Sequence, residues 1–72
     1  MKNFTIKSEN NSIFSSISII RGAEIKEFSL TLTSPTMSNM EMLSASLKGF
    51  KYEIEDIQYR EEKVLIHCRM EG

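Results

Sequence analysis

Hydrophobic and polar residues alternate in the middle of the chain. Phe28, Leu30 and Leu32 are separated by single serine and threonine residues. Alternation with a period of two is typical of a strand that buries one face. The pattern predicts a strand from Glu24 to Thr33, with these three side chains directed into a core.

The C-terminal part predicts two further strands. The first of these strands runs from Phe50 to Tyr59. Its apolar residues occupy even-numbered positions up to Ile54 and odd-numbered positions afterwards, so the buried face would change within the strand. We therefore expect a β-bulge near Glu55 and Asp56. A charged loop from Arg60 to Lys63 follows, of a length common in hairpins. In the last strand Val64, Ile66, Cys68 and Met70 alternate with Leu65, His67 and Arg69.

One amphipathic helix is expected between these strands. Ser34-Pro35 ends the preceding strand, because proline cannot donate to a β-ladder. Two starts compete: Ser34 as N-cap with Pro35 at the first helical position, or Ser38 as N-cap with Glu41 completing a capping box. Gly49 is expected to end the helix in the left-handed conformation. The apolar stripe expected to face the sheet is Met37, Met40, Leu43 and Leu47.

The N-terminal part predicts strands. Phe4 and Ile6 indicate a short strand to Lys7, and Glu9, Asn10 and Asn11 indicate a hairpin turn. Ser12 to Arg21 is rich in isoleucine, which favours strands. In that strand Ile13, Ile17 and Ile19 form one alternating set and Phe14 and Ile20 the other, and Gly22 and Ala23 supply the next turn.

Together these elements predict one small α+β domain over residues 1–72. The expected order is β-β-β-α-β-β, an antiparallel sheet of four or five strands with one helix packed on one face. This is a variant of the ferredoxin-like arrangement.

Composition narrows the function classes. The chain has 72 residues with a net charge of −1, which does not favour binding to nucleic acids or anionic membranes through bulk charge. No apolar run approaches the roughly 20 residues that a membrane helix needs, and no signal peptide is expected. A domain of this size has a small core, so a partner chain is a natural source of extra stability.

The chemically reactive residues do not combine into a predicted catalytic or metal site. His67 and Cys68 are neighbours in a strand and therefore point to opposite faces. We expect Cys68 to be an inert buried thiol, and His67 alone lacks a second nitrogen or sulfur ligand for zinc. Glu53, Glu55 and Asp56 are interpreted as a solvated strand face rather than a cation site. No cofactor is predicted.

Two other motifs favour structural interpretations. The methionines between Met37 and Met42 suit core packing better than copper binding. Lys48-Gly49-Phe50-Lys51-Tyr52 partly resembles the aromatic platform of RNA-recognition domains, but Lys51 stands where a small residue is needed. RNA binding is therefore a minor hypothesis, which requires Phe50 and Tyr52 to be exposed.

The succession of a strand, Ser34-Pro35-Thr36, a helix SNMEMLSASLKGF, and strands YEIEDIQY and KVLIHCRM resembles the periplasmic domain of the PilN fimbrial-assembly family. The related module in the L component of type II secretion systems is similar. The resemblance covers about 60 of the 72 residues as a pattern rather than as invariant residues. The chain differs from the family in lacking a preceding membrane helix and in having a strand at Phe4 to Lys7.

The resemblance implies a fragment of a longer protein at the periplasmic face of the bacterial inner membrane. Such platform proteins of type IV pilus or type II secretion machines are not enzymes, and they dimerise or dock other platform subunits. We expect Ile20, Leu65 and His67 at the interface, because each lies out of phase with the main apolar set of its strand. The alternative is a free-standing cytosolic protein of phage or plasmid type that binds and inhibits a host protein.

Overall fold

The computed structural model describes residues 2–7 and 10–72, which form four strands and two helices. The elements are β1 (Lys2–Lys7), α1 (Asn10–Gly22), β2 (Glu27–Thr33), α2 (Met37–Gly49), β3 (Tyr52–Tyr59) and β4 (Lys63–Met70). The predicted small α+β domain is confirmed at this level. The predicted order is wrong, because a second helix follows β1 and the chain runs β-α-β-α-β-β.

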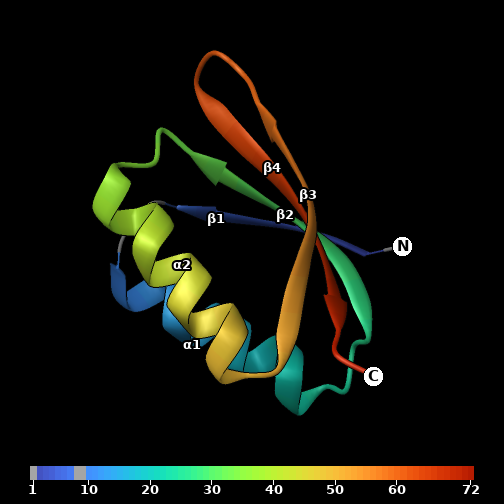
Figure 1. The fold of residues 1–72 in the computed structure, drawn as a ribbon. Helices are drawn as coiled ribbons and strands as arrows, with labels where there is room; N and C mark the ends of the chain where they lie inside the picture. Colours follow the sequence, from blue (N-terminus) through green and yellow to red (C-terminus); the bar gives the residue numbers. More distant parts are fainter. Residues whose placement is uncertain (1, 8–9) are drawn as a thin grey trace.

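The sheet is mixed rather than antiparallel. Its strand order is β1-β2-β4-β3, with β1 parallel to β2 and the other two pairs antiparallel. The ferredoxin-like order β-α-β-β-α-β is therefore not the one observed. Figure 1 shows α1 and α2 side by side on the same face of the sheet. The opposite face is left without a covering element among the described residues.

The segment predicted as a strand from Ser12 to Arg21 is the helix α1. Ile13, Ile17 and Ile20 recur at intervals of four and three, so they form one helical stripe, and all three are at most 3% exposed. Ile19, which the strand interpretation placed beside Ile13 and Ile17, is 71% exposed. The helical period of the core residues overrides the moderate β-propensity of isoleucine.

The expected hairpin before this segment is also wrong. Residue 9 lies outside the described residues, while Asn10 and Asn11 begin α1. β1 itself is confirmed as a strand, but it pairs with β2, in parallel, through the connection that α1 provides. A parallel pair needs such a crossover.

The ends of α2 differ from both predicted alternatives. Its N-cap is Thr36, not Ser34 or Ser38. The backbone N–H of Asn39 donates to Thr36 Oγ1 at 3.1 Å, and the backbone N–H of Thr36 donates to Asn39 Oδ1 at 2.9 Å. This is a capping box in which asparagine takes the place of glutamate.

The C-terminal end of α2 uses a residue that was not expected. Gly49 has no positive φ, and the left-handed residue is Lys51, at φ 66°. Of the predicted helical stripe, Leu43 and Leu47 are buried and Met40 is partly buried. Met37 is 79% exposed, so that part of the stripe is wrong.

The core lies between the two helices and the covered face of the sheet. Alternation in the two central strands is confirmed, since Phe28, Leu30, Leu32, Val64, Ile66 and Cys68 are all buried. Tyr52 joins them from β3, and its hydroxyl donates a hydrogen bond to the carbonyl of Ile25. The predicted bulge is also confirmed, because the β3–β4 register shifts between Ile54 and Asp56.

The assignment of α1 as a helix gives a direct test with two isoleucines. Replacing Ile17 by Ala removes a fully buried side chain and should lower the free energy of unfolding by about 2–5 kcal/mol. Replacing Ile19 by Ala should change it by less than about 0.5 kcal/mol, because that side chain is mostly in solvent. Urea titrations at low protein concentration measure both. Equal losses would support the strand interpretation, in which both residues share one face.

Candidate functional site

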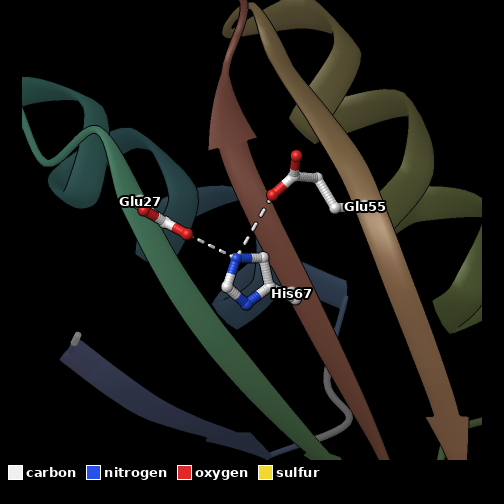
Figure 2. Close-up of side chains that lie close together, drawn as sticks. All are labelled: Glu27, Glu55 and His67. Atoms are coloured by element: carbon white, nitrogen blue, oxygen red, sulfur yellow. Dashed lines mark hydrogen bonds and ion pairs between the residues drawn. The ribbon is translucent and has the colours of Figure 1, made fainter.

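A cluster of charged side chains lies on the uncovered face of the sheet. Glu27 on β2, Glu55 on β3 and His67 on β4 point toward one another across three adjacent strands (Figure 2). Arg69, also on β4, contacts both carboxylates. We call these four residues the face cluster.

The imidazole of His67 lies between the two glutamates. Its Nε2 atom is 2.8 Å from Glu27 Oε2 and 3.3 Å from Glu55 Oε1. The guanidinium of Arg69 reaches the same two oxygens, with Nη2 3.5 Å from Glu27 Oε2 and Nε 3.3 Å from Glu55 Oε1. Glu27 Oε2 and Glu55 Oε1 therefore each contact both His67 and Arg69.

The strand register brings these residues together. Glu27 is directly opposite Arg69 in the β2–β4 pair, while the β3–β4 pair matches Ile54 with Cys68 and Asp56 with His67. Glu55 is the extra residue at the bulge and has no direct partner in this register. Because a bulge redirects a side chain, Glu55 faces the imidazole of His67.

The face cluster changes the acidity of Glu27. The hydrogen bond with His67 is the largest effect and lowers the pKa of this carboxyl group below its usual value. Desolvation is the second-largest effect and raises the pKa, while the charge of Arg69 and its hydrogen bond lower it further. The ionised carboxylate is therefore the form that the fold favours.

A glutamate with a lowered pKa stabilises the fold above its unfolded pKa, and this contribution disappears as the pH falls through the folded pKa. We therefore expect Glu27→Gln to be less stable than the wild type at neutral pH and to converge with it in acid. Denaturant titrations at a series of pH values measure the difference. The same change at Glu61, in the exposed β3–β4 loop, is the control. A difference for Glu27→Gln that persists unchanged in acid would contradict this account.

The donor atoms of Glu27, Glu55 and His67 all lie within 4.8 Å of one another. His67 has no second nitrogen or sulfur ligand for zinc beside it, but carboxylate oxygens also bind zinc. This grouping cannot be seen in the sequence, because it depends on the pairing of three strands that are distant along the chain. The predicted bulge near Glu55 was the one sequence feature that contributes to this grouping.

The chain's thiol is separated from its imidazole. Cys68 is fully buried on the helix side of β4, whereas His67 is on the opposite face. Burial raises the pKa of the Cys68 thiol to about 12. The prediction that Cys68 is buried is confirmed.

A thiol with this pKa should be unreactive in the native protein. Relative to its ordinary pKa of 9.0, a value of about 12 lowers the thiolate fraction at neutral pH about a thousandfold. We expect a thiol reagent such as DTNB to modify Cys68 very slowly in buffer and rapidly in denaturant. Rapid modification of the folded chain would show that Cys68 is accessible and reactive.

The predicted interface residues separate into two groups. Ile20 is 3% exposed and belongs to the core, because it lies on the buried stripe of α1. Its placement at a surface rested on the wrong strand assignment. Leu65 and His67 are half-buried on the uncovered face, where Leu65 is opposite Thr31 and Gln58.

The other sequence candidates are not arranged as a site. Tyr52 is 2% exposed and packs edge-on against Phe28, with ring centroids 4.9 Å apart. It therefore cannot form the exposed aromatic platform that the RNA-binding hypothesis requires.

Met37 and Met42 are exposed, which corrects their interpretation as core residues. Neither described helix is long and apolar enough to cross a membrane.

A second surface feature follows the β1 edge. Within residues 2–7 and 10–72, β1 pairs only with β2, so its other side is a free edge. Between this edge and α1 lies a groove of about 180 Å³. It is lined by Phe4, Thr5, Ile6, Ser16, Ile19 and Ile20. We call this feature the edge groove.

Comparisons with protein-family models, curated proteins and solved structures find no match to this chain. The resemblance to the PilN-like family stays a prediction from the residue pattern.

Proposed function

We propose that this chain is a non-enzymatic interaction domain that adds a second copy of itself to its sheet through β1. The observation that carries this proposal is the free β1 edge beside the edge groove. An edge strand presents unpaired backbone N–H and C=O groups, which an additional strand can satisfy. An adjacent groove can then accept alternate side chains of that strand.

The two edges of the sheet differ in how well they exclude such pairing. β3 has a bulge and carries Glu53, Glu55 and Asp56. Bulges and charged side chains are the devices with which proteins block edge pairing. β1 has no bulge in its pairing with β2, and its only charged residues, Lys2 and Lys7, are at its two ends. Strand addition is therefore favoured at β1.

The edge groove has the composition of a contact surface. Ile19 is 71% exposed on the face of α1 beside β1, and it shares the groove with Phe4 and Ile6. An exposed isoleucine next to a free edge supplies apolar contact area to a strand that pairs there. Burial of apolar area is the main driving force of most association.

The β1 sequence is self-complementary in an antiparallel arrangement. Side chains directly opposite each other in a sheet point to the same face. With Thr5 opposite Thr5 of a second copy, Phe4 is opposite Ile6 of that copy on the helix side. A two-fold axis relates the two strands, as in most homodimers, and the result is one continuous sheet of eight strands.

The absence of catalysis is part of the proposal. The thiol of Cys68 is fully buried with a raised pKa and lies on the opposite face from the imidazole of His67. The imidazole is engaged by two carboxylates. This arrangement supports a role in association better than a role in nucleophilic chemistry.

Two biological settings remain proposals. In the first, implied by the PilN-like resemblance, the domain dimerises or docks other platform subunits of a pilus or secretion machine at the periplasmic face of the inner membrane. In the second, it is a free-standing cytosolic protein that binds and inhibits a host protein. An in-frame membrane helix upstream in the parent gene would favour the first setting.

Two exposed helix residues provide a matched test of the edge groove. Replacing Ile19 by Glu places a charge beside β1 and should weaken self-association about tenfold or more. Met37→Glu makes the same type of change on α2, away from the groove, and should leave association unchanged. Sedimentation equilibrium up to about 1 mM chain detects dimers of even millimolar affinity. Thermal unfolding checks that each variant folds.

Leu65→Glu distinguishes the edge groove from the uncovered face. If the interface lies at the face, as the strand phase of Leu65 and His67 predicts, this variant should weaken association and Ile19→Glu should not. A wild-type chain that stays monomeric throughout the concentration range would contradict self-association by either surface.

A further inference from the structure

We propose that Glu27, Glu55 and His67 form a binding site for a divalent transition-metal ion of the zinc class. The site lies on the uncovered face and does not depend on the edge groove. Each residue supplies one donor atom: a carboxylate oxygen from Glu27 and from Glu55, and Nε2 from His67 (Figure 2).

The spacing of the donor atoms suits a small ion. Ligands about 2.0–2.1 Å from a tetrahedral zinc ion lie about 3.3 Å from one another. The His67 nitrogen is 2.8 Å from the Glu27 oxygen and 3.3 Å from the Glu55 oxygen, and all three donor atoms lie within 4.8 Å of one another. Small rotations of side chains that are partly exposed are enough to admit an ion between them.

The hydrogen bonding of His67 also favours a cation that both carboxylates can share. One imidazole nitrogen carries at most one proton, yet Nε2 of His67 faces two carboxylate oxygens. That proton can be directed well at only one of them. A divalent ion in its place bonds to Nε2 and to both oxygens together, and it balances the two negative charges. Metal and proton therefore compete for the same position.

The backbone already holds the three ligands in place. They come from β2, β3 and β4, which are adjacent strands joined by continuous ladders. Glu55 reaches the site because it is the extra residue at the bulge. A site on paired strands requires little ordering when the ion binds, and this lowers the entropic cost of binding.

Arg69 is the competing cation. It contacts the same two carboxylate oxygens as His67, so its charge opposes an incoming ion. Its side chain is 53% exposed, and it can therefore turn toward solvent when a metal binds. Because the charge of Arg69 repels a cation, removing Arg69 should strengthen metal binding.

The ligand set favours zinc-class ions over calcium or magnesium. One imidazole nitrogen and two carboxylate oxygens suit zinc, cobalt or manganese, whereas calcium prefers six to eight oxygen ligands. Three protein ligands leave at least one position for water.

NMR of the untagged chain tests the proposal with zinc chloride as the probe. His67 is the only histidine, so the imidazole signals report on this site alone. We expect zinc to shift these signals saturably. Glu55→Gln and Glu27→Gln should weaken binding at least about tenfold, while Arg69→Gln should strengthen it several-fold. Glu61→Gln removes the same charge from the β3–β4 loop, at the far end of the hairpin from the cluster, and should change the affinity less than about twofold.

Two outcomes would overturn the proposal. One is the absence of a saturable shift of the His67 signals at about 1 mM zinc. The other is an equal loss of affinity in Glu61→Gln and Glu55→Gln, which would mean general attraction by negative charge. Thermal unfolding in the absence of metal shows whether each variant folds. In wild type the unfolding temperature should rise with zinc concentration, because an ion that binds only the folded chain stabilises it.

Discussion

Packing of the isoleucine stripe of α1 against the sheet determines which face of the sheet is buried. Ile13, Ile17 and Ile20 lie in one core with Phe28 and the other helix-side residues of the strands. Both helices are needed for this layer, and the described chain has no further element for the second face. The side chains on that second face must therefore tolerate water, which polar and charged groups do.

This one-sided arrangement separates residues that are adjacent in sequence and joins residues that are distant. His67 and Cys68 are neighbours on β4, but one is in the face cluster and the other is in the core. Burial makes the thiol a poor nucleophile, while the imidazole meets two carboxylates from other strands. The chemistry available to the chain is thus located at the uncovered face, where ions, protons or a partner chain can reach it.

The parts of the fold that could be predicted are those with unambiguous periodicity. β2 and β4 alternate strictly, and the phase change after Ile54 indicated the bulge. α1 was missed because isoleucine favours strands, although Ile13, Ile17 and Ile20 also have helical spacing. The N-cap was missed because the Thr36–Asn39 capping box competed with two plausible serine caps. The face cluster could not be predicted, since it requires the register of β2, β3 and β4.

The bulge in β3 links the two surfaces to which we assign roles. By adding one residue opposite β4, it turns Glu55 toward His67 and completes the three donor atoms on the uncovered face. The same irregularity, with the acidic residues around it, makes β3 a poor edge for an additional strand. β1 is then the edge that remains regular, and α1 places Ile19 beside it. In these two proposals, a single inserted residue therefore favours ion binding at the face and directs strand pairing to the opposite edge of the sheet.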